Sequence, residues 1–203
     1  MVKAPPGYLR KPAGPGQVAP ELARDLIAAA EATLGTAASA ALLAAARLAA
    51  VPPLSESLPE DTARALHHAL RRSHPAEAPA ILAAAGRSTA DSLIASRLSP
   101  RAQTMLSAGP WTISGWLLGR WAAQNGWTFA GSGRLSQTGP LSFEIRANPL
   151  IRGETAPAPL CHFHAALFEQ LFRRLVDPRL ACREMACAAT GAPACVFVLA
   201  LDA

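Results

Sequence analysis

All four cysteines of this 203-residue chain lie after residue 160, close to a glutamate. Cys182, Cys187 and Cys195 fall within the stretch ACREMACAATGAPAC together with Glu184, and Cys161 opens the stretch CHFHAALFEQLFRRLV. Three thiolates and a carboxylate are ligand types that Zn²⁺ takes in a tetrahedral site. Buried thiols that act as small apolar side chains, and redox-active thiols, are alternative interpretations. The chain has no CxxC pair, which weakens both a zinc-ribbon and a thioredoxin interpretation.

The elements that must position these residues are a helix and a hairpin. Residues 160–176 read as an amphipathic helix, and Cys161 opens it. Residues 180–190 and 194–201 read as two strands joined by the turn sequence TGAP. A turn near Gly191 would make Cys187 and Cys195 cross-strand neighbours. Cys182 lies five residues before Cys187, an odd offset that turns it to the other face of a regular strand.

The rest of the chain divides into a helical front and a mixed rear. Residues 1–20 are rich in proline and glycine and are expected to form a flexible arm. Pro20 leads into a helix that Gly35 ends or bends, and three or four more helices follow up to residue 104. A tryptophan-rich helix from Trp111 should end at residues 125–126, before two strand-like stretches, 127–135 and 141–151. We therefore predict an α+β fold with an antiparallel sheet, divided into an arm (1–20), a helical region (21–104) and a ligand-binding domain (105–203).

Composition narrows the possible functions. Hydrophobic residues make up 51% of the chain and charged residues 16%, enough to build a substantial core. The net charge of +5 is spread along the chain, and no basic block with interleaved aromatics indicates nucleic-acid binding. The N-terminus has no signal-peptide core, and the most apolar stretch is too short to span a bilayer. We expect a cytoplasmic protein, in which structural disulfides are disfavoured.

The run from Cys161 to Leu199 resembles the 4-vinyl reductase domain family. Its members share a cysteine that opens a helix, an E-x-x-C motif, a turn followed by a cysteine, and an apolar strand. The resemblance covers roughly residues 105–203 and is greatest to the stand-alone member of bacteriochlorophyll biosynthesis. It implies a zinc ion held by Cys161, Glu184, Cys187 and Cys195, with Cys182 left outside. Four protein ligands would make that zinc structural.

Four histidines need their own interpretation. His164 lies three residues after Cys161, on the same helix face, and could replace Glu184 as a ligand. A supporting or surface role is the simpler interpretation for His164 and His162. His67 and His68 could bind the magnesium of a tetrapyrrole, although a solvated or capping role is favoured.

The resemblance also implies a pocket between helices and sheet, and often a homodimer. A large flat apolar ligand would suit aromatic walls, and its propionates would suit arginine. Spacings of five residues scatter Trp111, Trp116 and Trp121 around their helix, so most tryptophans, Trp127 among them, should be core. The candidate ligand-binding residues are Trp111, Trp116, Trp121, Phe129, Phe143, Arg120 and Arg146, with Arg134 as a further arginine near them in sequence.

Three functions follow as hypotheses. The first is an accessory protein of bacteriochlorophyll biosynthesis that carries or presents a magnesium-porphyrin or protochlorophyllide-type intermediate to neighbouring enzymes of the pathway. The second is the vinyl reductase that the family name suggests. The third is a sensor of small aromatic molecules. No nicotinamide, flavin or iron–sulfur motif is present to supply electrons, so the sequence favours the carrier over an enzyme.

Overall fold

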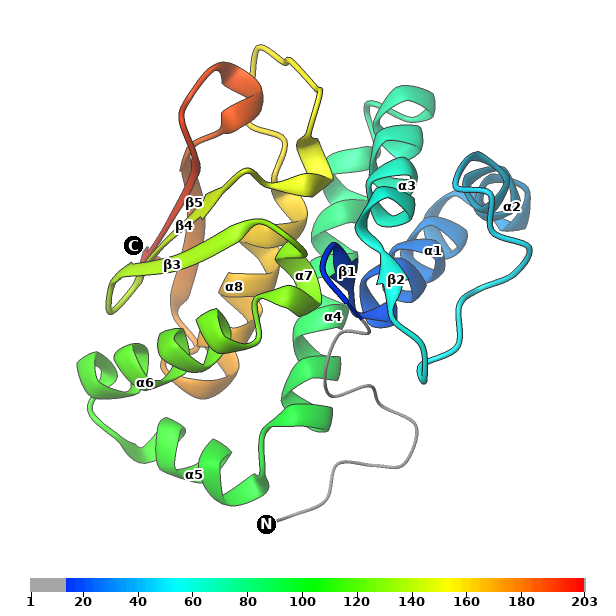
Figure 1. The fold of residues 1–203 in the computed structure, drawn as a ribbon. Helices are drawn as coiled ribbons and strands as arrows, with labels where there is room; N and C mark the ends of the chain where they lie inside the picture. The colour runs from blue at the N-terminus through cyan, green and yellow to red at the C-terminus, as the bar shows by residue number, and fades with distance from the viewer. Residues whose placement is uncertain (1–13, 203) are drawn as a thin grey trace.

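A computed structural model describes residues 14–202 of the chain. Helices fill the first half, and a four-stranded antiparallel sheet with one helix against it forms the core of the second (Figure 1). This is the α+β architecture that the sequence predicts. The helices are α1 (Pro20–Leu34), α2 (Thr36–Ala45), α3 (Glu60–Ser73), α4 (Ala78–Arg97), α5 (Pro100–Ala108), α6 (Trp111–Gln124), α7 (Trp127–Ala130), η1 (Pro149–Ile151), α8 (His162–Leu175) and η2 (Ala188–Thr190). The strands are β1 (Gln17–Val18), β2 (Leu58–Pro59), β3 (Arg134–Gly139), β4 (Ser142–Arg146), β5 (Leu180–Ala186) and β6 (Cys195–Leu201).

Local sequence explains most helix ends in the first half. Pro20 occupies the first turn of α1, and Gly35 separates α1 from α2 with a φ of +87°, a conformation that glycine adopts without strain. Helix α3 has two acidic residues in its first turn and Arg71 and Arg72 in its last, as the helix dipole favours. These helices end where the sequence predicts.

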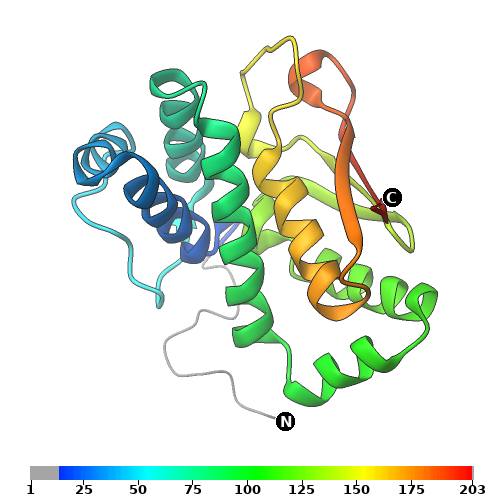
Figure 2. The same ribbon diagram turned by 180° about the vertical axis from the view of Figure 1, so that it is seen from behind.

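The two halves meet where α4 crosses α8. Both views show α4 running alongside α8 (Figures 1 and 2). Gly86 lies at the closest approach, because a Cβ there would come within 2.2 Å of the backbone oxygen of Phe163. A glycine is therefore needed for the helices to pack this closely, and the crossing fixes the helical half against the start of α8.

The sheet has the strand order β3-β4-β6-β5, with every neighbouring pair antiparallel. Phenylalanines from the sheet and from α8 fill the core between them. Phe143 of β4 stacks on Phe168 of α8 with ring centroids 4.6 Å apart, and Phe129, Phe172 and Phe197 are also fully buried. Aromatic packing of this kind adds to the stabilisation that burial itself provides.

The structure differs from the sequence prediction in the stretch 127–135. Residues 127–130 form the short helix α7 rather than a strand, and β3 begins only at Arg134. Trp127, Thr128 and Phe129 favour strands by propensity, but Thr128 and Phe129 are buried here and tertiary packing overrides the local preference.

The expected arm and membrane segments can be compared only in part. Residues 1–13 lie outside the described residues, but Gln17 and Val18 form β1, which pairs with β2, and Val18 is fully buried. Ordered structure thus begins before residue 21. Among the helices of residues 14–202, none is both long enough and apolar enough to cross a bilayer.

Candidate metal centre

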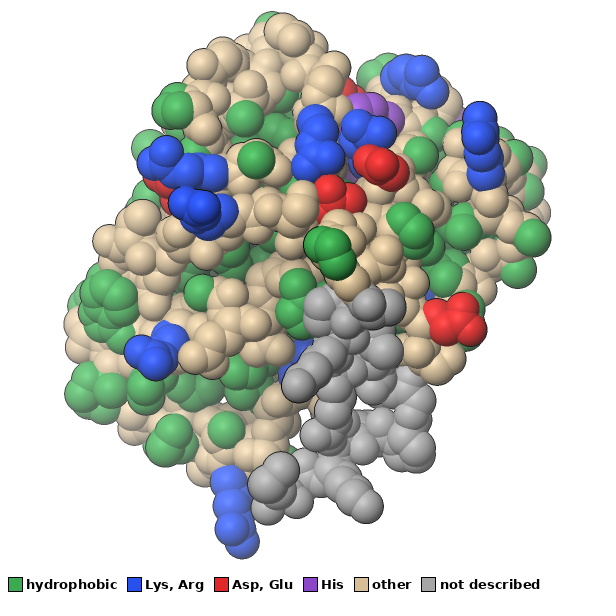
Figure 3. All heavy atoms as spheres, in the orientation of Figure 1, with side chains coloured by type: hydrophobic (Ala, Val, Ile, Leu, Met, Phe, Trp, Pro, Cys, Tyr) green, Lys and Arg blue, Asp and Glu red, His purple; other side chains and the backbone are tan. Residues whose placement is uncertain are grey.

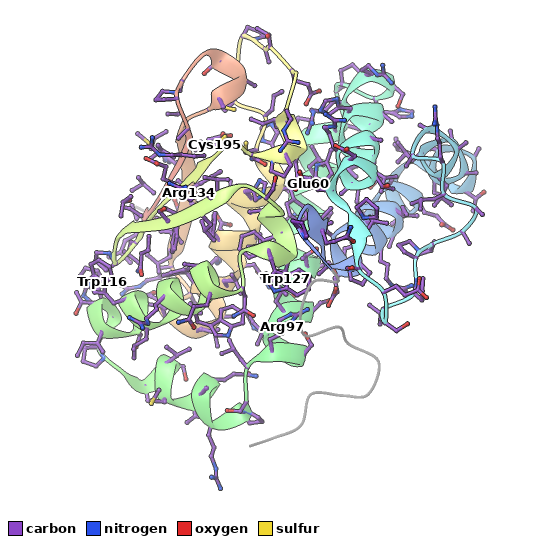
Figure 4. All side chains as sticks on the ribbon, viewed as in Figure 1. Glu60, Arg97, Trp116, Trp127, Arg134 and Cys195 are labelled. Atoms are coloured by element: carbon purple, nitrogen blue, oxygen red, sulfur yellow. The ribbon has the colours of Figure 1, made fainter. Side chains whose placement is uncertain are left out.

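Four potential metal ligands converge from three segments at one end of the sheet. Cys161 precedes the first residue of α8, Glu184 lies on β5, Cys187 links β5 to η2, and Cys195 is the first residue of β6. The hairpin turns at Gly191, which has a φ of +94°. Figure 4 labels Cys195 beside this loop. The order and turn match the hairpin that the sequence predicts.

The distances between these groups suit a tetrahedral ion. One potential ligand atom from each of Cys161, Glu184, Cys187 and Cys195 lies within 4.8 Å of the others. The Sγ of Cys161 is 3.4 Å from that of Cys195 and 3.9 Å from that of Cys187. Sulfurs bound to one zinc ion at about 2.3 Å would lie about 3.8 Å apart, whereas a disulfide needs about 2.05 Å. The four side chains could hold a metal ion.

A buried carboxylate oxygen supports a cation at this position. Glu184 Oε2 accepts a hydrogen bond from the backbone N–H of Cys161 at 2.9 Å. Its Oε1 is buried and has no hydrogen-bond partner among the described residues. Burial raises the pKa of Glu184 to about 8. An unpaired carboxylate oxygen beside buried sulfurs is costly, and a bound cation would remove that cost.

The sulfurs themselves are arranged to favour thiolates. Cys161, Cys187 and Cys195 are buried. A hydrogen bond from the Cys161 thiol lowers the pKa of Cys187 and of Cys195, and backbone N–H groups of the surrounding loops act in the same direction. The pKa of Cys161 is raised, first by its hydrogen bond to Cys187. A divalent ion would displace the remaining thiol proton, because the metal binds thiolate.

Asn148 is a contributor to the site that the sequence did not reveal. It is buried in the turn before η1, and its Nδ2 lies 3.4 Å from the Sγ of Cys161 and 3.9 Å from that of Cys195. The same nitrogen lies 3.4 Å from Nδ1 of His164. Only the fold brings this amide to the sulfurs, since no motif connects Asn148 with the cysteines in sequence.

His164 supports the site rather than joining the four ligands. Its Nε2 lies 3.0 Å from the carbonyl oxygen of Phe129 and must donate to it, which leaves Nδ1 to accept from Asn148. Burial lowers the pKa of His164 to about 4 and keeps the ring neutral. A chain of hydrogen bonds thus runs from Phe129 through His164 and Asn148 to Cys161, and Glu184 occupies the fourth position.

Cys182 and the other histidines lie outside the group. Cys182 is part-buried on β5, its backbone N–H donates to Glu169, and burial raises the pKa of its thiol to about 12. His162 is half-buried. His67 is buried edge-on against Phe163, and His68 Nε2 lies 3.1 Å from Glu154.

The structure divides the candidate ligand-binding residues between the core and the surface. Phe129 and Phe143 are fully buried, and Trp121 is partly buried against the core. Trp111, Trp116 and Arg120 are exposed on α6, and exposed Arg146 pairs with Glu144 beside it on the sheet. Exposed Arg134 lies opposite Arg146 on β3, and Trp127 stacks under Arg97 at 5.2 Å. The phenylalanines and the exposed tryptophans therefore do not line one cavity together.

Comparisons with known proteins agree with the site. The vinyl-4-reductase domain family, which is the 4-vinyl reductase domain of the sequence resemblance, matches residues 141–201, a range that contains Cys161, Glu184, Cys187 and Cys195. The chain is 46% identical over 190 residues to the bacteriochlorophyll synthase 23 kDa chain of Cereibacter sphaeroides, covering 93% of this chain and 92% of that one. It is 39% identical over 158 residues to the protein of that name from Rhodobacter capsulatus, covering 75% of this chain and 74% of that one.

Solved structures share the fold at low sequence identity. The phenol-responsive sensory domain of the transcription activator PoxR superposes with a TM-score of 0.54 at 16% identity, over 73% of this chain and 78% of that one. An H-NOX protein from S. oneidensis gives 0.55 at 14% identity, over 92% of this chain and 100% of that one. An H-NOX protein from K. algicida gives 0.58 at 7% identity, over 92% and 97%. The sequence relatives show the family: the chain belongs with the bacteriochlorophyll synthase 23 kDa chains, and its C-terminal part is a vinyl-4-reductase domain.

Proposed function

We propose that this protein is an accessory factor of bacteriochlorophyll biosynthesis that binds a magnesium-porphyrin or protochlorophyllide-type intermediate and carries or presents it to neighbouring enzymes. The observation that carries the proposal is the 46% identity, over 93% of the chain, to a protein named as a bacteriochlorophyll synthase chain. The fold adds support, because one H-NOX structure that it resembles addresses heme distortion, and heme is also a tetrapyrrole.

The metal in this proposal is zinc, and its role is structural. Three cysteines and a glutamate are a donor set that zinc accepts, and the unpaired Oε1 of Glu184 supplies the fourth position. Zinc bound by four protein ligands has no open position, so it would supply a cross-link rather than Lewis-acid chemistry. The chain's own residues would do the rest: Cys161 ties the start of α8 to the hairpin, and Asn148 and His164 hold the sulfur of Cys161 in place.

The pigment-binding residues within reach of solvent lie on α6. Trp116 and Arg120 are four residues apart, so their side chains share one helix face. A flat macrocycle could stack on the indole while its propionates pair with the guanidinium. Phe129 and Phe143 would contact a ligand only if the packed core opened.

Titration of purified protein with magnesium protoporphyrin in vesicle-free buffer tests the proposal. We expect a shift of the porphyrin absorption and a Kd in the micromolar range or below, about −8 kcal/mol or stronger. Trp116→Ala with Arg120→Ala should weaken binding, whereas Met185→Ala with Arg72→Ala, on other surfaces, should not.

Two results would replace the carrier with another function. Reduction of a divinyl substrate by the purified protein and NADPH alone would make it the vinyl reductase. Tight binding of phenol without binding of any tetrapyrrole would make it a sensor of small aromatic molecules.

A further inference from the structure

Helix α6 packs against the sheet with its small residues. Its buried face consists of Ser114, Gly115, Leu118, Gly119 and Ala122. A Cβ on Gly115 would come within 2.7 Å of the carbonyl oxygen of Pro140, and one on Gly119 within 2.1 Å of the side chain of Gln137. An amphipathic surface helix ordinarily buries its large apolar side chains. Here the inward face is filled by close backbone approach instead.

The large apolar residues of this region consequently face outward. Trp111 is 54% exposed, Ile113 56%, Trp116 49% and Leu117 46%, and Met105 of the preceding helix α5 is 61% exposed. These are five of the eight large apolar side chains that are exposed among residues 14–202, and they fall within 13 residues of sequence. Single exposed apolar residues are ordinary, but a cluster marks an interaction surface. We call these five residues the α5–α6 face.

The charge around the α5–α6 face has one sign. From residue 92 to residue 143 the chain has no aspartate or glutamate, but it has four arginines, of which Arg101, Arg120 and Arg134 are exposed. Figure 3 shows green apolar atoms and two separate blue basic side chains over the end formed by α5 and α6, with no red acidic side chain there in this view. The nearby acidic residues of α8 and its following turn are paired, Glu169 with Arg173 and Asp177 with Arg179.

This charge pattern identifies the kind of partner. A symmetric dimer through the face would bring its arginines against their own copies, with no acidic residue in the segment to neutralise them. An anionic bilayer surface accommodates both features, because tryptophan lies well at the headgroup level, aliphatic side chains enter the acyl boundary, and arginine pairs with phosphate. We propose that the α5–α6 face docks this protein on the surface of anionic lipid bilayers, without spanning them.

The fold leaves the rest of the molecule free in such a complex. Helices α5 and α6 lie at one end, and the loop between β5 and β6 lies at the other, in both ribbon views (Figures 1 and 2). A bilayer under α5 and α6 would therefore leave the cysteine loop in water. The docking does not depend on pigment binding, since it uses lipid contacts alone.

Co-sedimentation of the full chain with vesicles, in the absence of pigment, tests the proposal. We expect binding to vesicles of phosphatidylcholine with about one-third phosphatidylglycerol, much weaker binding to pure phosphatidylcholine, and a decrease as salt screens the arginines. Ile113→Glu with Leu117→Glu should reduce the partition coefficient at least tenfold. Met185→Glu places the same charge on an equally exposed apolar residue of β5 and should leave binding unchanged.

Arginine variants separate the electrostatic part. Arg101→Ala should weaken binding to the anionic vesicles several-fold, whereas Arg72→Ala, on exposed α3, should not. Lack of wild-type binding to anionic vesicles, or equal binding of the double glutamate variant, overturns the proposal.

The oligomeric state of the double variant provides a further check. A wild-type dimer in solution that becomes monomeric in the double variant and does not bind vesicles would make the face a self-association surface and also overturn the proposal. Magnesium protoporphyrin titration without vesicles reports on pigment binding separately, so failure of either proposal can be recognised independently.

Discussion

The cysteine loop and the α5–α6 face break the usual distribution of side chains in opposite directions. At the loop, thiols and a carboxylate oxygen are buried where apolar groups ordinarily lie. At the α5–α6 face, tryptophan, isoleucine and leucine are exposed where polar groups ordinarily lie. The first arrangement is costly for the isolated fold and is relieved by a cation inside it. The second costs the fold little and is relieved by a partner outside it. Changes at the loop should therefore act on stability, and changes at the face on association.

Replacing one buried thiol should have the largest effect. Cys187→Ser should lose the metal and destabilise the protein by about 3–5 kcal/mol, because the remaining buried charges lose their counter-ion. Cys182→Ser is the matched control, since Cys182 lies in the same hairpin but outside the ligand group, and it should keep both metal and stability. Urea unfolding with metal analysis measures both quantities. A Cys187→Ser protein with full zinc content would remove Cys187 from the site.

Protonation of His164 should produce the next largest effect. Burial lowers the pKa of His164 from an ordinary value near 6.5 to about 4 in the folded protein. Below pH 6.5 the unfolded chain therefore binds a proton that the folded chain does not. Its contribution is complete above pH 6.5 and falls by about 3 kcal/mol as the pH drops to 4.

His164→Gln isolates this contribution from the protonation of the thiolates. Glutamine can keep the bonds to Phe129 and Asn148 but does not titrate. The variant should show a shallower loss of unfolding free energy between pH 6.5 and 4 than the wild type. Identical slopes would show that His164 does not titrate in this range.

Adding a methyl group under α6 should have an intermediate effect. Gly115→Ala forces the helix away from the backbone of Pro140 and should cost about 1–3 kcal/mol. Gly119→Ala should cost less, because its nearest neighbour is the movable side chain of Gln137. Thermal unfolding of the two variants gives the comparison. Equal or reversed costs would argue against close backbone packing as the reason for the small inward face.

Charges on the outward face of α6 should change stability least. Ile113→Glu with Leu117→Glu should shift the unfolding free energy by less than about 0.5 kcal/mol for each residue, because both side chains are already about half in water. A loss of several kcal/mol in chemical denaturation would mean that the face is part of the core, and the contrast with the loop would fail.

The sequence predicts the hairpin better than its surroundings. Glu184, Cys187 and Cys195 can be arranged from strand alternation and the turn at Gly191, because those contacts are local. Cys161 joins them only through the family motif. Asn148 could not be predicted, since its contact with Cys161 depends on how the loop through η1 packs on α8.

Aromatic content is a weaker guide than the cysteines. Phe129 and Phe143 look alike in sequence whether they line a pocket or fill a core, and the stacking of Phe143 on Phe168 places it in the core. The outward face of α6 is equally hidden from pattern analysis. Helical periodicity gives a wide apolar surface, and only the tight packing at Gly115 and Gly119 determines which side is buried.

Metal analysis of the purified wild-type chain, combined with thermal unfolding before and after a strong chelator, tests the central claim most directly. We predict about one zinc per chain and a fall in Tm of roughly 10 °C on chelation, as expected for a loss of several kcal/mol in a chain of this length. A metal-free protein whose Tm is the same with and without added zinc would contradict the account.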